Sequence, residues 1–237
     1  MSAFDLSGKQ ALVTGASKGI GRAIALAYAE AGADVALVSR SADTLAEVGK
    51  EIEALGRRAV VIPADLTDRD AAAASVAAAI EGLGHLDIVV NNAGGSNFLV
   101  EFKDLRLSGW DKLMRLNLDS AMAVCHAVAP HLLDRGEGNV INVASVAALG
   151  APFLAPYAAA KAGLVALTKT LAVEWAGAGC ASTPCAPAGR PPTSTATCGR
   201  TRRPAPPRSP PCPCDAGGPW RRWPPPRCSW PARPRPT

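Results

Sequence analysis

The sequence predicts an α/β fold in which a doubly wound parallel sheet carries helices on both faces. Two observations predict it. Short, continuously apolar runs alternate with segments of helical periodicity as far as residue 177. The first of these runs leads directly into a glycine-rich turn that opens a helix. Strands that are apolar throughout are typical of a parallel sheet buried on both sides.

The first expected unit is a strand, a glycine turn and a helix. Gln10 to Val13 is the apolar run, Thr14 to Gly21 is the turn, and Ala23, Ile24 and Tyr28 continue at helical spacing. The later elements are expected in the order strand Asp34–Ser39, helix Asp43–Leu55, strand Ala59–Ile62, helix Asp68–Gly82, strand Leu86–Val90, helix Trp110–Leu132 in one or two pieces, strand Asn139–Val143 and helix Tyr157–Ala176.

The composition changes abruptly in the last sixty residues, Ala178 to Thr237. They contain no Leu, Ile, Val, Met, Phe or Tyr, yet they hold 17 of the 21 prolines, six of the seven cysteines and ten arginines. A segment without aliphatic side chains cannot bury enough apolar area to offset an ordering entropy of about 1–2 kcal/mol per residue. We therefore expect a domain over residues 1–177 and a disordered Pro/Arg-rich tail over residues 178–237.

A shifted reading frame would explain this tail. When the third base of each codon from Cys180 to Ala188 is joined to the first two bases of the next, the permitted residues include Arg-Val-Asn-Ala-Val-(Arg or Cys)-Pro-Gly. That phrase suits a strand and turn following the Tyr157 helix. We infer a frameshift between about Trp175 and Gly179, and an evolved Pro/Arg tail is the alternative.

Charge and cysteine content exclude several classes of protein. The formal net charge is +5, but residues 1–177 carry 15 basic and 19 acidic side chains, so this part is mildly acidic. We expect no nucleic-acid partner. Cys125 alone lies in the expected domain, and Cys212 and Cys214 have no nearby His, so no metal site is predicted. No segment resembles a signal peptide or a membrane span, and we expect a cytoplasmic protein with no membrane contact.

The glycine turn has the geometry of a phosphate site. Gly15, Gly19 and Gly21 follow a strand and open a helix, which places bare backbone N–H groups and a helix N-terminus where a pyrophosphate can bind. A tight strand-to-helix connection is the alternative reading of the glycines alone.

The motifs together resemble the short-chain dehydrogenase/reductase family over about residues 8–177. The glycine spacing matches its fingerprint, Asn91-Asn-Ala-Gly94 its signature after strand four, and Tyr157-Ala-Ala-Ala-Lys161 its Tyr-x-x-x-Lys motif. The resemblance implies a Rossmann-like fold, an NADP(H)-dependent oxidoreductase similar to 3-oxoacyl carrier-protein reductases, and the catalytic residues Asn117, Ser145, Tyr157 and Lys161. It also implies cofactor contacts from Gly15, Ser17, Lys18, Gly19, Ile20, Gly21, Arg40, Asp65, Leu66, Asn91, Ala93, Gly94, Tyr157 and Lys161.

The chemistry of the motif supports this resemblance. Tyr157 and Lys161, four residues apart, share one helix face, so the ammonium can lie near the phenol and favour its ionised form. Tyr157 can then give a proton to a carbonyl or take one from an alcohol. By resemblance, Lys161 also binds the nicotinamide ribose, Ser145 orients the substrate oxygen and Asn117 holds a water that links Lys161 to solvent.

The residue after the second strand predicts the cofactor. An acid about twenty residues beyond the glycines would accept the 2′-hydroxyl of NAD, but Ser39-Arg40 stands there. Arg40 can pair with a 2′-phosphate, and Lys18 can add a second cation. NADP(H) is therefore the expected cofactor.

The tail limits what the resemblance implies. In this family a strand after the Tyr157 helix completes the sheet, and proline cannot donate to a strand ladder, so we expect the edge of the Asn139–Val143 strand to be open. The expected function is reduction of a small carbonyl substrate or oxidation of a secondary alcohol. A non-catalytic, nucleotide-binding product is one alternative, and a tail that binds nucleic acid through Arg and Trp is another. The resemblance implies a homo-oligomer for the intact family member.

Overall fold

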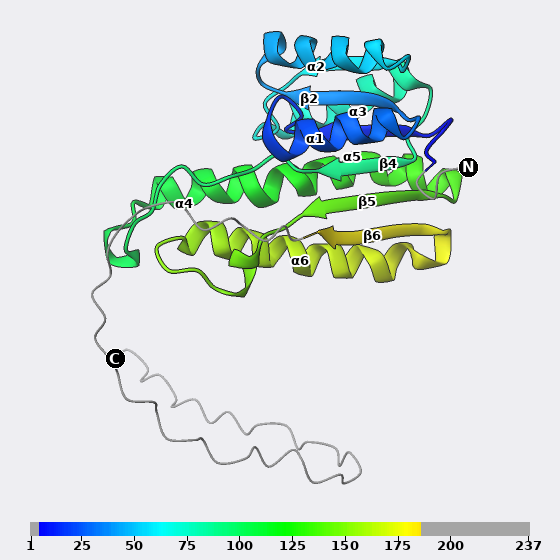
Figure 1. Ribbon diagram of the computed structural model, residues 1–237. Helices are drawn as coiled ribbons and strands as arrows, with labels where there is room; N and C mark the ends of the chain where they lie inside the picture. The colour runs from blue at the N-terminus through cyan, green and yellow to red at the C-terminus, as the bar shows by residue number, and fades with distance from the viewer. Residues whose placement is uncertain (1–4, 186–237) are drawn as a thin grey trace, which may run out of the picture. The chain divides into compact units, whose positions relative to one another are not determined.

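A computed structural model describes residues 5–185, which form a six-stranded parallel sheet flanked by helices (Figure 1). The strands are β1 (Gln10–Thr14), β2 (Asp34–Ser39), β3 (Ala59–Pro63), β4 (Ile88–Asn91), β5 (Gly138–Val143) and β6 (Cys180–Cys185). The helices are α1 (Gly19–Glu30), α2 (Ala42–Ala54), α3 (Arg69–Leu83), α4 (Leu107–Met114), α5 (Ser120–Arg135) and α6 (Ala155–Trp175). The alternating order of strands and helices confirms the predicted fold class.

The central strands are buried on both faces. All five residues of β1 are buried, and the four inner residues of β2 are also buried. This explains why these strands read as continuous apolar runs instead of alternating ones. Their backbone groups pair in register, with Leu12 opposite Ala36 on one side and opposite Val89 on the other.

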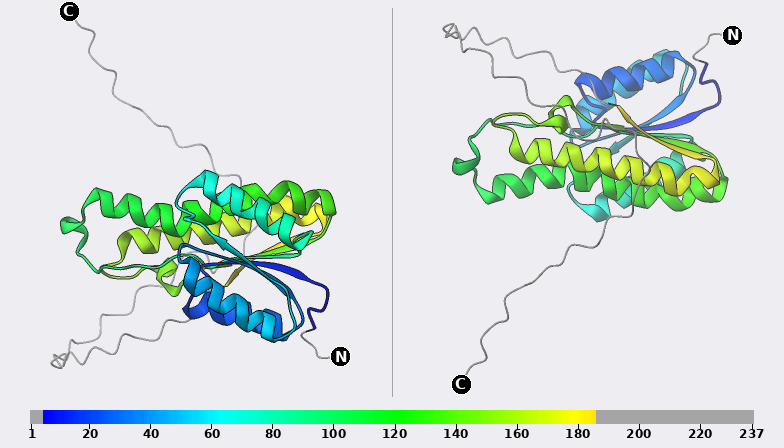
Figure 2. Two further views of the ribbon diagram at one scale, coloured as in Figure 1. Left: turned by 90° about the horizontal axis from the view of Figure 1, so that it is seen from above. Right: turned by 90° about the horizontal axis from the view of Figure 1, so that it is seen from below.

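Alternate side chains of the sheet enter two separate cores. Val13, Leu37 and Val90 pack with α1 and α2, whereas Leu12, Val38 and Val140 pack with α3, α5 and the end of α6. Figure 2 shows α1 and α2 on one face of the sheet and α3, α5 and α6 on the other. A strand period of two residues thus supplies both faces from one continuous apolar run.

The strand order β3-β2-β1-β4-β5-β6 places a reversal between β1 and β4. The chain moves outward from β1 to β3, then crosses back to β4 and continues in the opposite direction. In open α/β sheets, ligands bind at the carboxyl ends of the strands beside this reversal. The turn after β1 and the loop after β4 therefore form the expected binding edge.

The prediction that the edge of β5 is open was wrong. Residues 180–185 form β6, which pairs in parallel with β5 from Gly138–Cys180 to Val143–Cys185. Strand pairing uses the backbone, so β6 forms without large apolar side chains, and its buried residues are Cys180 and Ser182. Pro184, which has no N–H to donate, is tolerated because β6 is the last strand of the sheet among the described residues. The predictions of disorder and a shifted frame beyond residue 185 lie outside the described residues.

The predicted helix over residues 110–132 is divided into two α-helices. A π-helical turn, Arg115–Asp119, separates α4 from α5. Such a turn contains one extra residue per turn and changes the direction of the side chains that follow it, and π-turns are frequent at functional sites. Across residues 5–185, no helix has the length and apolar character needed to cross a bilayer.

Candidate active site

A cleft of about 510 Å³ lies at the carboxyl ends of β1, β2 and β4. It is lined by the glycine turn, the ends of β2 and β3, and the loop after β4. The lining residues are Gly15, Ser17, Lys18, Gly19, Ile20, Ser39, Arg40, Ser41, Ala64, Asp65, Leu66, Asn92, Ala93, Gly94, Gly95, Asn97 and Leu116. Most of the predicted cofactor contacts are among them.

The glycine turn presents an uncapped helix N-terminus to this cleft. Lys18 is the N-cap residue of α1, yet no side chain caps the helix and no acid lies in its first turn. Gly15 and Gly19 both have φ near +60°, which favours glycine. A Cβ on Gly21 would overlap the carbonyl oxygen of Gly15, so only glycine lets the turn close. The free N–H groups fit an anionic group such as a pyrophosphate.

Thr14 ties this turn to the loop after β4. Its hydroxyl accepts hydrogen bonds from the N–H groups of Asn92 and Ala93 at 2.9 and 3.1 Å, and it donates to the carbonyl oxygen of Val90 at 3.2 Å. The Asn92 side chain donates to the carbonyl oxygen of Thr14 at 3.0 Å. The two cleft walls on either side of the strand reversal are therefore held at a fixed separation.

Asn91, which we predicted as a cofactor contact, does not line the cleft. Its side chain is buried and donates to Oδ1 of Asn142 at 2.9 Å and to Sγ of Cys125 at 3.3 Å. The next residue, Asn92, lines the cleft in its place. Consecutive side chains at a strand end point to opposite sides, and the sequence alone does not show which of two adjacent asparagines faces the ligand.

The outer part of the cleft is basic. Lys18, Arg40 and the hydroxyl-bearing Ser39 and Ser41 line it together. Asp65 lies close by, and its Oδ1 accepts hydrogen bonds from the N–H and hydroxyl of Thr67 at 3.0 and 2.8 Å. The backbone hydrogen bond, aided by the Thr67 hydroxyl and the charge of Arg40, holds the pKa of Asp65 below its ordinary value. Asp65 therefore stays ionised at neutral pH.

Lys161 is buried beside Tyr157. Its Nζ donates to the carbonyl oxygen of Val143 at 2.7 Å and lies 5.8 Å from the centre of the Tyr157 ring. Only 3% of Lys161 is exposed, and this burial lowers its pKa from 10.5 to about 8. At pH 7 the side chain is still mostly protonated, so a desolvated positive charge lies next to the half-buried tyrosine.

Asn117 lies on the π-helical turn and fastens the loop after β4. Its Oδ1 accepts from the N–H of Gly95 at 2.8 Å, and its Nδ2 donates to the carbonyl oxygens of Gly95 and Leu113, each at 3.0 Å. A Cβ on Gly94 would lie 2.6 Å from Asn117 Oδ1 and 3.4 Å from Lys161 Nζ. Gly94 therefore lies between two predicted catalytic residues, Asn117 and Lys161, and the absence of a side chain there lets them approach each other.

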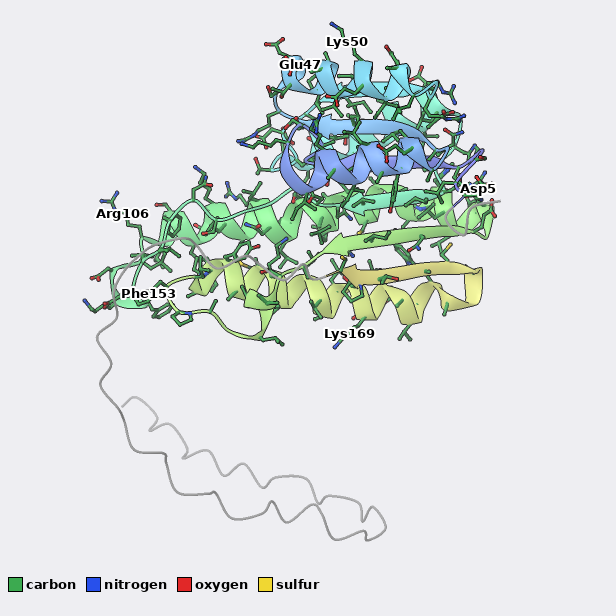
Figure 3. The ribbon with its side chains drawn as sticks, in the orientation of Figure 1. Asp5, Glu47, Lys50, Arg106, Phe153 and Lys169 are labelled. Carbon is green, nitrogen blue, oxygen red and sulfur yellow. The ribbon has the colours of Figure 1, made fainter. Side chains whose placement is uncertain are left out.

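Ser145 follows β5 and begins a short 3₁₀ turn, Val146–Leu149, that packs against α6. Its Oγ accepts the N–H of Ala147 at 3.2 Å, so the hydroxyl hydrogen is free to donate elsewhere. The loop beyond it reaches Phe153, whose carbonyl oxygen accepts the N–H of Val100 at 3.0 Å. Figure 3 shows Phe153 and Arg106 at the same end of the molecule, where the loops after β4 and β5 meet.

The structure thus brings the predicted residues together in two groups. The cleft holds most of the nucleotide-binding candidates, while Asn117 and Lys161 lie beside Gly94 and Tyr157 lies next to Lys161. The predicted site residues that do not line the cleft are Gly21, Asn91, Asn117, Ser145, Tyr157 and Lys161. Sequence reasoning missed several lining residues, namely Ser39, Ser41, Ala64, Asn92, Gly95, Asn97 and Leu116. Most of these residues are close in sequence to Arg40 or to the Asn91–Gly94 motif, and this closeness could have predicted them.

Comparison with known proteins agrees with this arrangement. A family model described as short chain dehydrogenase matches residues 9–201. The chain belongs to the short-chain dehydrogenase family. Gluconate 5-dehydrogenase of Gluconobacter oxydans is 40% identical over 173 residues, covering 73% of this chain and 67% of that protein. The 3-oxoacyl-[acyl-carrier-protein] reductase of Thermotoga maritima is 37% identical over 175 residues, covering 73% and 70%.

Solved structures of short-chain dehydrogenases share the fold. A crystal structure from Sinorhizobium meliloti, assigned as a short-chain alcohol dehydrogenase, is 43% identical with a TM-score of 0.76, covering 83% of this chain and 77% of that one. A structure from Beutenbergia cavernae, which holds NADP, is 38% identical with a TM-score of 0.73, covering 78% of this chain and 74% of that one. Carveol dehydrogenase of Mycobacterium avium, which holds NAD, is 30% identical with a TM-score of 0.73, covering 76% of this chain and 70% of that one. Solved relatives of this short-chain dehydrogenase therefore include one that holds NAD and one that holds NADP.

Proposed function

We propose that this short-chain dehydrogenase is an NADP(H)-dependent oxidoreductase that interconverts a small carbonyl compound and its secondary alcohol. The observation that carries the proposal is the buried Lys161 ammonium, which lies 5.8 Å from the centre of the Tyr157 ring and beside Gly94 of a cleft that Lys18 and Arg40 also line. The alternating strands, the uncapped N-terminus of α1 and the Asn117–Gly95 bonds support it. When bound, the nicotinamide cofactor supplies or accepts the hydride.

In this proposal the protein's residues bind, orient and move a proton. The N–H groups at the start of α1 hold the pyrophosphate, and Arg40 with Lys18 pairs with the 2′-phosphate. Ser145, whose Oγ accepts from Ala147, donates its remaining hydrogen to the substrate oxygen. Tyr157 gives its phenol proton to that same oxygen during reduction, and the Lys161 charge stabilises the phenolate left behind.

The cofactor assignment rests on the charges at the end of β2. Arg40 lies between Ser39 and Ser41, all three line the cleft, and Lys18 lies across from them on the glycine turn. An acidic side chain in this position would repel a phosphate, and Asp65, the acid that lines the cleft, already accepts two hydrogen bonds from Thr67. Two cations and two hydroxyls suit a 2′-phosphate better than a 2′-hydroxyl.

The substrate class follows from the relatives in coarse terms only. The gluconate dehydrogenase and the 3-oxoacyl reductase both bear names of oxidoreductases that act at a carbonyl or alcohol carbon. Ketones, sugar-derived keto acids and 3-oxoacyl thioesters are therefore the substrates to test.

The test is NADPH oxidation by the purified 237-residue chain across these three substrate groups. Tyr157→Phe should lower turnover by about 10²- to 10⁴-fold, because it removes the proton donor and leaves the ring in place. Tyr28→Phe is the matched control, since Tyr28 lies on α1 away from the cleft. NADPH binding without turnover of any substrate would instead support the non-catalytic alternative.

A further inference from the structure

A chain of buried polar groups lies beneath the site and connects α6 to the sheet. The hydroxyl of Thr168 accepts a hydrogen bond from Nδ2 of Asn142 at 2.9 Å and donates to the carbonyl oxygen of Leu164 at 2.6 Å. Oδ1 of Asn142 accepts from Nδ2 of Asn91, which also contacts Sγ of Cys125. All of these side chains are at least 97% buried, and their hydrogen bonds link α6 to β5, β4 and α5.

Apolar packing alone is a weak means of fixing the position of α6. Along its buried face from Ala160 to Trp175, Leu164 is the one large apolar side chain between Lys161 and Thr168. Apolar contact is non-directional, so on its own it resists a small slide or rotation of a helix less than directional bonds do. Hydrogen bonds depend on distance and angle, and they penalise such a shift.

Two hydrogen bonds to adjacent residues of β5 fix the helix instead. Lys161 bonds to the carbonyl oxygen of Val143, and Thr168 bonds to the side chain of Asn142. The two helix residues lie seven positions apart, about 10 Å along the axis. One hydrogen bond would permit the helix to pivot about it, whereas two bonds separated by this distance hold both position and direction.

This arrangement matters for the reacting groups because they are on the two elements being joined. Ser145 follows directly from β5, and Tyr157 lies in the first turn of α6. Their separation therefore depends on how α6 is placed against β5. A displacement of about 1 Å between reacting groups can lower an enzymatic rate by about a hundredfold.

We propose that Thr168, through Asn142, is a positioning residue that sets the placement of Tyr157 and Lys161 relative to Ser145. Thr168 touches neither the cleft nor the proposed substrate position, and it acts through the placement of α6. The expected effect on rate rests on the proposed function. The position of Lys161 can be measured without any turnover.

The decisive variant is Thr168→Val, which keeps the shape of the side chain and removes the hydroxyl. We expect kcat for carbonyl reduction to fall about ten- to hundredfold, with an altered pH profile of kcat. Thr168→Ser keeps the hydroxyl and should restore the wild-type kcat and pH profile. Thr170→Val is the matched control, because the Thr170 hydroxyl also bonds to its own helix, at Ala166, but is exposed and has no bond to the sheet.

A second readout follows Lys161 itself by an NMR pH titration of its Cε resonance. If α6 shifts, Lys161 leaves its buried position at Val143 and its pKa rises towards the ordinary value in Thr168→Val, but not in Thr170→Val. Should the wild type turn over no substrate, this titration still decides the positioning role, while the proposed function fails separately.

Other outcomes would overturn the proposal. A Thr168→Val protein with a lower Tm but wild-type kcat, pH profile and Lys161 titration would give Thr168 a merely structural role. If Thr168→Val does not fold, Thr168→Cys serves in its place, since a thiol is small and accepts hydrogen bonds only weakly. Wild-type kcat and an unchanged Lys161 titration in Thr168→Cys would then reject the inference.

Discussion

Lys161 is the residue of the site whose charge is most strongly affected by burial. Its charge is held in the interior by one hydrogen bond to Val143 and by its position over the Tyr157 ring. Such burial opposes the charged form, which is why the pKa falls to about 8. The burial of this charge should therefore reduce the stability of the fold at neutral pH.

This cost of burying Lys161 predicts a pH dependence of stability. The pKa is about 8 in the folded protein and about 10.4 in an unfolded chain, so between these values the unfolded chain binds more protons. The free energy of unfolding should rise by about 2 kcal/mol from about pH 7 to about pH 9.5 relative to Lys161→Met, as measured by urea unfolding. Lys169→Met, at an exposed lysine on the same helix, is the control that should follow the wild type. Parallel stability curves for wild type and Lys161→Met would contradict the burial of a charge.

Arg40 supports a prediction about cofactor choice. Arg40→Asp removes the partner of the 2′-phosphate and supplies an acceptor for a 2′-hydroxyl, so the preference for NADP over NAD in kcat/KM should fall by about ten- to hundredfold. Lys50→Asp makes the same change in net charge on the outer side of α2, where Figure 3 shows the lysine pointing away from the sheet. Selectivity that is unchanged in Arg40→Asp, or reduced equally in Lys50→Asp, would reject the assignment.

At the scale of elements, the sheet and its connections place the site, and local departures from regular structure refine it. The π-helical turn at Arg115–Asp119 directs Asn117 towards Gly95, where it bonds to both backbone groups. Periodicity predicted a helix here but could not predict the extra residue in the turn, because an insertion of one residue leaves the apolar pattern nearly intact.

β6 is a regular strand although its sequence contains few residues that favour strands. Its buried residues are Cys180 and Ser182, and the Ser182 hydroxyl has no hydrogen-bond partner within the described part of the chain. A buried, unpaired hydroxyl costs about 1–3 kcal/mol. The pairing with β5 is thus made by the backbone with little help from side chains.

Ser182→Val tests this interpretation of β6. The change removes the unpaired hydroxyl and buries added apolar surface against α6, so the free energy of unfolding should rise by about 1 kcal/mol. Thr183→Val is the control, since Thr183 is exposed on the same strand and should change stability little. Measurement by urea unfolding suffices, and a Ser182→Val protein no more stable than Thr183→Val would show that residues 180–185 do not pack as described.

At the scale of the whole molecule, the sequence predicted the fold class and most of the residues that line the cleft. Continuous apolar strands, the glycine turn and the Tyr157–Lys161 spacing sufficed for the fold and for most of the cleft, because each depends on local pattern. The roles of Asn91 and Asn92 were not predictable, since they depend on which side of β4 each one faces. Composition also predicted no strand after α6, because it reports side chains and not the backbone bonds that form β6.

The remaining question at this scale is whether the frame changes near Trp175, and the coding DNA answers it directly. If the reading frame changes there, the neighbouring frame should encode Arg-Val-Asn-Ala-Val in place of the residues from Cys180. This sequence adds two valines and removes Pro184 from the strand. In place of Ala181 and Pro184, the two valines would raise the strand propensity of β6, because β-branched residues favour strands and proline does not.

A chain restored to that frame should then melt at least about 5 °C higher than the 237-residue chain and should turn over NADPH faster with the same ketone. Equal Tm and equal turnover would mean that the present residues after α6 support the site as well as the restored ones. DNA that encodes no such phrase in either neighbouring frame would establish the Pro/Arg-rich sequence as the evolved one. In that case Pro184 belongs to the evolved sequence of β6, and Ser182→Val is the change that we expect to stabilise this strand.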